Sequence, residues 1–152
     1  MPYRICKILE IETAHILSKH PDHCKFPHGH SRKIEFVLES DQLDESEMVC
    51  DFKIIKSTMQ ALMRRFDHAM CVNSKDKNFG VFKAIYGDHV VHFDSEDPTT
   101  EVMARVIFNH FKEQLRKYVE QPAVGYPLRN IVRIVKVRVW ETSSSWAEYS
   151  ER

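Results

Sequence analysis

Two segments near the start of the chain alternate apolar and polar residues with a period of two, which is typical of strands with one buried face. They are residues 3–15 and 30–39. A further alternation covers residues 131–141, and a short one covers residues 146–149. The side chains that these patterns turn toward a core are Leu9, Ile11, Thr13, Ile34, Phe36, Leu38, Val135, Val137 and Val139.

Two other segments repeat apolar residues at spacings of three and four, which predicts amphipathic helices. The first follows Asp51, a suitable N-cap, and covers residues 52–66. The second begins within Asp97-Pro98-Thr99-Thr100-Glu101, where capping side chains, an early proline and an acid in the first turn favour a helix start. We expect this helix to end near Tyr118.

Between the two helices, short β-like runs in residues 79–93 flank Tyr86-Gly87-Asp88-His89, which predicts an inserted hairpin. Hairpins adjacent in sequence, together with two helices, predict an α+β fold with an antiparallel sheet and both helices on one face. Because no internal repeat, low-complexity tract or linker interrupts the pattern, we expect residues 1–152 to form a single domain.

Composition and charge exclude several functional classes. The 22 Lys and Arg residues balance 22 Asp and Glu residues, and no basic stripe appears, so nucleic acid is not an expected partner. No apolar signal core follows Met1, and no apolar run approaches the ~20 residues of a membrane span, so we expect a cytoplasmic protein without a membrane partner. Without a C-x-x-C pair, the cysteines are expected to stay reduced.

Three histidines continue the core-facing rows of the first two strands. His28 and His30 precede Ile34 in phase, and His15 ends the row of Ile11 and Thr13. If the strands pair, the three imidazoles converge, and three nitrogen ligands with an open fourth position are typical of catalytic zinc. The alternative is that His28-Gly29-His30 is a turn with two hydrogen-bonded histidines. The third histidine in phase favours the metal.

Cys24 lies four residues before His28, on a loop that must pass close to such a metal. A thiol near a cation has a lowered pKa, which would make Cys24 a base or nucleophile. The same spacing also permits Cys24 to be a fourth zinc ligand. A third interpretation, an inert small hydrophobic residue, suits Cys6, Cys50 and Cys71 better.

Two further acidic positions are candidates for chemistry. Asp67-His68 follows the first helix and suits a proton relay, although a histidine stabilised by the helix dipole is the alternative. Glu141 ends the apolar row of the last long strand. It either accepts paired N–H donors from a ligand or marks the emergence of the strand into solvent. Histidines without an argument from phase are expected on the surface or in packing: His20, His23, His89, His92 and His110.

The combined motifs resemble the 6-pyruvoyltetrahydropterin synthase family through nearly the whole chain. They are Thr13-Ala14-His15-Ile16-Leu17, Cys24-x3-His28-Gly29-His30, Met48-Val49-Cys50-Asp51-Phe52, Asp67-His68, Pro98-Thr99-Thr100-Glu101 and Glu141-Thr142. The C-x3-H-G-H spacing is similar to the bacterial 6-carboxytetrahydropterin synthase branch of queuosine biosynthesis. The resemblance implies the T-fold, a four-stranded antiparallel sheet with two helices, and trimers that stack into homohexamers with active sites between subunits.

The resemblance also implies roles for individual residues. It implies Zn²⁺ on His15, His28 and His30, with the open position taken by side-chain oxygens of the pterin substrate. It implies that Cys24 is the proton-abstracting base, with Asp67 and His68 as its relay. It implies that Glu141 anchors the pterin ring, with Thr99, Thr100 and Glu101 near the pocket.

The activity implied is that of a zinc-dependent lyase that converts 7,8-dihydroneopterin triphosphate to 6-carboxy-5,6,7,8-tetrahydropterin, releasing acetaldehyde and triphosphate. One alternative is the pyruvoyl-forming synthase, and another is a non-catalytic zinc or pterin-binding module in which Cys24 closes the zinc site. The chain departs from the family pattern at Ile16, where many members have arginine, at Glu47, at Cys71-Val72-Asn73, and in an insertion at residues 74–95.

Overall fold

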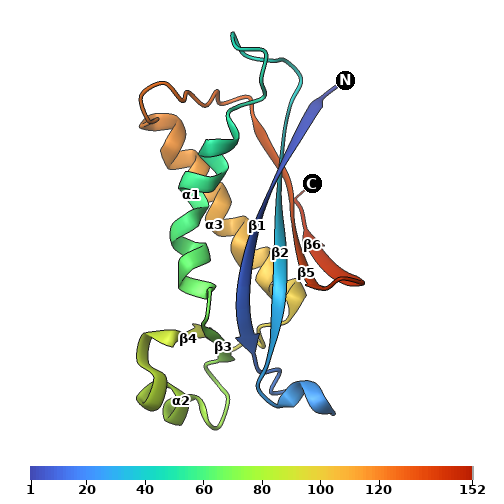
Figure 1. The fold of residues 1–152 in the computed structure, drawn as a ribbon, viewed down its shortest axis with the longest axis vertical. Helices are drawn as coiled ribbons and strands as arrows, with labels where there is room; N and C mark the ends of the chain where they lie inside the picture. Colours follow the sequence, from blue (N-terminus) through green and yellow to red (C-terminus); the bar gives the residue numbers. More distant parts are fainter. Residues whose placement is uncertain (152) are drawn as a thin grey trace.

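The computed structural model describes residues 1–151, in which one mixed sheet of six strands carries two long helices on the same face (Figure 1). The strands are β1 (Tyr3–His15), β2 (His28–Ser40), β3 (Met70–Asn73), β4 (Val90–Phe93), β5 (Arg133–Thr142) and β6 (Ser145–Tyr149). The helices are α1 (Phe52–Phe66), α2 (Phe79–Tyr86) and α3 (Thr100–Glu120), with 3-10 turns η1 (His23–Lys25) and η2 (Gly87–His89). No helix among these residues is long and apolar enough to cross a membrane.

The sheet has the order β4-β3-β1-β2-β5-β6. Four of the six strands, β1, β2, β5 and β6, pair as antiparallel neighbours, as the alternating patterns predicted. The short strands β3 and β4 extend the β1 edge in parallel. In the β1–β2 pair, His15 lies opposite His28 and Thr13 lies opposite His30, so the three histidines come from the same end of two adjacent strands.

The core lies between the sheet and the helices α1 and α3. The predicted row Ile34, Phe36 and Leu38 is fully buried, and the ring of Phe36 contacts that of Phe111 on α3 at 5.1 Å between centroids. Both helices begin where the sequence predicts. Asp51 accepts a hydrogen bond from the backbone N–H of Lys53 at 2.8 Å, which caps α1.

The prediction of a hairpin in residues 79–93 is wrong. Residues 79–86 form the helix α2, and the strand β4 that follows pairs in parallel with β3. A helix places Phe79 and Phe82, three residues apart, on one face, where both pack on a small apolar cluster. That cluster consists of Ile16, Val72 and Val90, and α2 therefore covers the outer face of β3 and β4.

The prediction that Val135 lies in the row of Val137 and Val139 is also wrong. The register of β2 and β5 shifts so that Leu38 pairs with Ile134 and Val37 pairs with Lys136. Val135 is the extra residue of this β-bulge, and Ile134 packs on the core in its place. Val137 and Val139 are fully buried, as predicted.

Candidate metal centre

The three histidines of β1 and β2 converge on one point. Their possible ligand atoms all lie within 4.8 Å of one another, and their ring centroids are separated by 4.5 to 5.0 Å. The Nε2 atoms of His15 and His30 are 3.2 Å apart. Three imidazoles at these distances can hold one metal ion, which is the arrangement that the strand patterns predicted.

Two of these imidazoles are oriented by backbone carbonyl groups. Nδ1 of His15 lies 2.8 Å from the carbonyl oxygen of Pro98, and Nδ1 of His28 lies 2.8 Å from that of Phe26. Because a carbonyl oxygen only accepts, each Nδ1 carries the proton and each Nε2 keeps a free lone pair. The rings are therefore held in the tautomer and orientation that a metal requires.

Burial favours the neutral form of these ligands. It lowers the pKa of His15 to about 4, and the positive charge of Arg32 acts in the same direction. Burial also lowers the pKa of His30, again with a contribution from Arg32. Since only a neutral imidazole can bind a metal, these two histidines need not lose a proton first at neutral pH.

Arg32 is a residue of the site that the sequence analysis missed. It is 1% exposed, its Nη1 donates to the hydroxyl of Thr100 at 3.1 Å, and its Nη2 lies 3.4 Å from Nδ1 of His15. Its Nε has no hydrogen-bond partner within residues 1–151. The available signal was its even position between His30 and Ile34, which places a guanidinium in the core-facing row.

The carboxylate of Glu141 lies beside the histidines. Its Oε1 is 3.7 Å from Nε2 of His15 and 3.6 Å from Nε2 of His30. The side chain is 31% exposed, so it is neither sealed in the core nor fully solvated. An acceptor group therefore stands next to the point where the imidazole Nε2 atoms meet.

Cys24 lies in the turn η1 and is partly buried. Its backbone carbonyl accepts a hydrogen bond from the N–H of Leu17 at 3.0 Å, which fixes the loop. Within residues 1–151, the group of ligand atoms that could share one ion contains the three histidines and leaves out the Cys24 thiol. The centre is therefore a three-histidine arrangement in a single chain.

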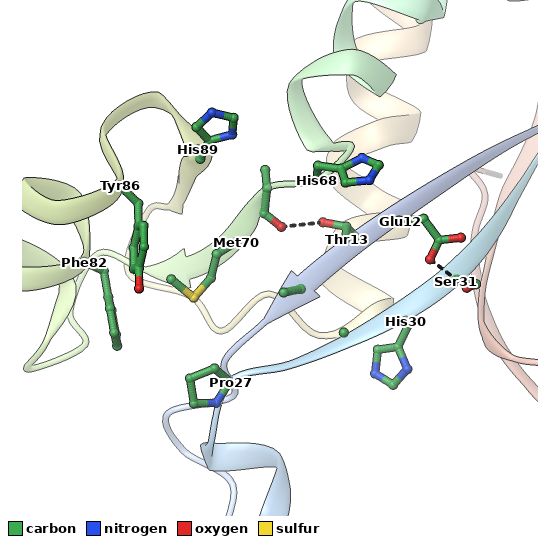
Figure 2. Close-up of a pocket in the computed structure, with 13 residues that line it drawn as sticks. Glu12, Thr13, Pro27, His30, Ser31, His68, Met70, Phe82, Tyr86 and His89 are labelled. Carbon is green, nitrogen blue, oxygen red and sulfur yellow. Dashed lines mark hydrogen bonds between the residues drawn. The ribbon is translucent and has the colours of Figure 1, made fainter.

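The pair Asp67 and His68 lies apart from this centre. Asp67 accepts from the backbone N–H of Glu12 at 2.8 Å and contacts Nδ1 of His68 at 3.0 Å, and both contacts lower the pKa of its carboxyl. His68 has a positive φ of 56° and lines a pocket of about 600 Å³. In Figure 2, the rings of His68 and His30 lie on opposite sides of the strands β1 and β2. The structure thus gathers the histidines and Glu141 but not this pair.

The segment before α3 connects the parts of the site. Thr99 caps α3 by accepting from the N–H of Val102 at 3.1 Å, whereas Glu101 is exposed. Asp97 accepts from the side chain of Asn73 at 2.9 Å and from the backbone N–H of Lys19 at 2.8 Å. The carbonyl of Pro98 also contacts Nδ1 of His15. Through these three contacts, the segment before α3 connects β1, β3 and the β1–β2 connection.

Comparisons with known proteins agree with this architecture. Residues 4–152 match the family model described as 6-pyruvoyl tetrahydropterin synthase. The 6-carboxy-5,6,7,8-tetrahydropterin synthase of Aquifex aeolicus is 32% identical over 131 residues, which cover 84% of this chain and 76% of that protein.

Two solved structures share the fold. A protein of Wolinella succinogenes superposes with a TM-score of 0.75 at 21% identity, covering 100% of this chain and 99% of its own. The 6-pyruvoyl tetrahydropterin synthase of Plasmodium vivax superposes with a TM-score of 0.72 at 15% identity, with the same coverage of 100% and 99%.

We expect Asp97→Ala to lower the free energy of unfolding by about 2 to 4 kcal/mol, because it leaves the buried side-chain amide of Asn73 and the partly buried backbone N–H of Lys19 without an acceptor. Chemical denaturation of the metal-free protein measures this. Asp94→Ala is the matched control, since Asp94 is exposed and its change should stay within about 0.5 kcal/mol. Equal stability of the two variants would contradict the connecting role of Asp97.

Proposed function

The chain belongs to the 6-pyruvoyl tetrahydropterin synthase family, and we propose that it is a zinc-dependent lyase of the 6-carboxytetrahydropterin synthase type. In the proposed reaction, 7,8-dihydroneopterin triphosphate and one water molecule give 6-carboxy-5,6,7,8-tetrahydropterin, acetaldehyde and triphosphate. The observation that carries this proposal is the convergence of His15, His28 and His30 beside Glu141. The likeness to relatives named as 6-carboxytetrahydropterin synthases supports the choice of product.

Zinc suits the donor set of this centre. Three imidazoles without a thiolate leave a fourth position open, as in catalytic rather than structural zinc sites. The absence of Cys24 from the group of converging ligand atoms in residues 1–151 argues against the non-catalytic module. When bound, zinc would act as a Lewis acid that makes the carbinol C–H of the substrate more acidic.

We assign proton abstraction to Cys24 and relay of the proton to Asp67 and His68. Cys24 lies four residues before His28, on the loop that bears the ligand. Asp67 holds Nδ1 of His68 at 3.0 Å, which leaves Nε2 of that ring free to exchange a proton. Asp67 and His68 do not reach the three histidines of their own chain. We therefore propose that Asp67 and His68 of a second copy complete the site.

Free sheet edges support such an assembly. β1 pairs with β3 only at Ala14 and His15, and Asp67 and His68 bond the backbone of Glu12, so within residues 1–151 the edge of β1 from residue 3 to residue 11 pairs with no strand. The outer edge of β6 is likewise the end of the sheet. Unpaired edges of this length are templates for pairing with another chain. We therefore propose a homo-oligomer, a trimer or hexamer, that acts in the cytoplasm.

The anchor for the pterin ring is Glu141. Its carboxylate can accept the ring N–H and the exocyclic amine as a bidentate pair, which fixes the ring while the side chain of the substrate meets the metal centre. We place Thr99, Thr100 and Glu101 along the same pocket. The direct contribution of Thr100 is to hold Arg32 under the site, through the hydrogen bond at 3.1 Å.

Product analysis tests the reaction. The zinc-loaded protein, incubated with 7,8-dihydroneopterin triphosphate, should release one acetaldehyde for each 6-carboxytetrahydropterin formed. A 6-pyruvoyl product without acetaldehyde would assign the chain to the pyruvoyl-forming synthases of the same family. Pterin binding without turnover would support the non-catalytic module.

We expect one zinc ion per chain, and we expect His28→Ala or His30→Ala to lose most of it, because two nitrogen ligands bind zinc far less tightly than three. Metal analysis of the purified proteins measures the content. His23→Ala is the control, since His23 lies in the same loop with a side chain that is 94% exposed. Full zinc content in both ligand variants would exclude this centre.

Cys24→Ala should keep zinc and pterin binding but reduce kcat by at least ~10²-fold, as expected for loss of a positioned acid–base group. The control is Cys6→Ala, since Cys6 is an exposed thiol on β1, outside the loop that holds Cys24. If zinc is lost together with the Cys24 thiol, that thiol is a ligand and not the base.

Glu141→Ala should weaken pterin binding by about 2 to 4 kcal/mol, because the paired donors of the ring are then left without acceptors. Glu141→Gln should be nearly as damaging, since its amide presents a donor to one of the ring donors. Titration with neopterin measures the affinity, and zinc content should not change. Exposed Glu10 provides the control Glu10→Gln. Wild-type affinity in Glu141→Ala would rule out the anchor.

A further inference from the structure

A second cavity, of about 670 Å³, lies between the β1–β2 connection and the segment that joins β3 to α2. Figure 1 shows both segments at the same end of the sheet. The hydroxyl of Ser18 on the first segment donates to Asp76 on the second, so the two walls are joined directly. Lysines line both walls: Lys25 comes from the first, and Lys75 and Lys77 come from the second.

The charges of this cavity favour an anion. Within residues 1–151, none of the three lysines forms an ion pair with a carboxylate, and the Nζ of Lys25 instead lies 5.4 Å from the centre of the Phe26 ring. The one carboxylate of the lining is Asp76, whose two oxygens already accept from Ser18 and from the backbone N–H of Asn78. The lining therefore has an excess of positive charge and free ammonium donors.

The cavity lies at the end of β1 and β2 that carries the metal centre. Ile16, which lines it, follows His15 in the chain, and Pro27, which also lines it, precedes His28. Pro27 and Phe82 also line the pocket that contains His30 and His68 (Figure 2). A long ligand with its reactive carbon at the histidines can therefore extend past Pro27 toward the lysines.

We propose that Lys25, Lys75 and Lys77 bind the triphosphate group of the substrate. This assignment rests on the proposed function, since it names the place of one part of that substrate. Lysine ammonium groups bind phosphates as point charges, and a triphosphate offers several negative oxygens to all three. The inserted segment at residues 74–95 thereby gains a role, because its first residues supply two of the lysines.

Binding of inorganic triphosphate to the zinc-loaded protein tests the site without turnover. We expect Lys75→Ala combined with Lys77→Ala to weaken this binding about tenfold, and wild-type binding to weaken as salt concentration rises. The matched control is Lys56→Ala combined with Arg64→Ala, which removes two positive charges from the exposed side of α1. Equal loss in both double variants, or loss in neither, would overturn the proposal.

A second measurement distinguishes binding of the triphosphate group from binding of the pterin ring. The lysine variant should raise KM for 7,8-dihydroneopterin triphosphate about tenfold and leave the affinity for unphosphorylated neopterin unchanged. Equal weakening of neopterin would place the lysines at the ring and contradict the assignment. If the wild-type protein does not turn over this substrate, the proposed function fails, whereas the binding of inorganic triphosphate still decides the role of the lysines.

Discussion

The register of β1 against β2 is the constraint on which the site depends. His15 opposite His28, and Thr13 opposite His30, place three imidazoles at one end of the core-facing surface. Since side chains alternate between faces, a slip of one residue would turn the histidines of one strand to the outer surface. The same slip would expose Ile34, Phe36 and Leu38, so the packing of α1 and α3 protects the geometry of the metal centre.

Backbone groups, and not only side chains, orient the imidazoles that this register brings together. Carbonyl groups of Phe26 and Pro98 fix two imidazoles, and the second of these carbonyls follows Asp97, whose carboxylate holds the β1–β2 connection. A carbonyl cannot be removed by substitution of its side chain, but it moves when its segment moves. Changes at residues that do not contact the histidines, such as Asp97, can therefore alter the orientation of these rings.

The sequence was sufficient where the signal is local and periodic. Alternation predicted β1, β2 and β5, spacing of three and four predicted α1 and α3, and phase predicted the convergence of His15, His28 and His30. It predicted the strand β4 but failed for α2 and for the partner of β4, because residues 79–86 are apolar enough for either structure and the choice depends on contacts with Ile16 and Val72. Arg32 could not be predicted because a charged side chain normally indicates exposure, whereas this guanidinium is 1% exposed and donates to Thr100.

The bulge in β5 affects how the strand would respond to the deletion of one residue. Before the bulge, Ile134 faces the core, and after it Val137, Val139 and Glu141 do so, although these positions differ in parity. The extra residue Val135 makes this change of phase possible. In a chain that lost Val135, Ile134 would directly precede Lys136, the strand would alternate without interruption, and Ile134 and Glu141 would both still face the core. The bulge is thus a position at which β5 can lose one residue while its carboxylate stays directed at the histidines.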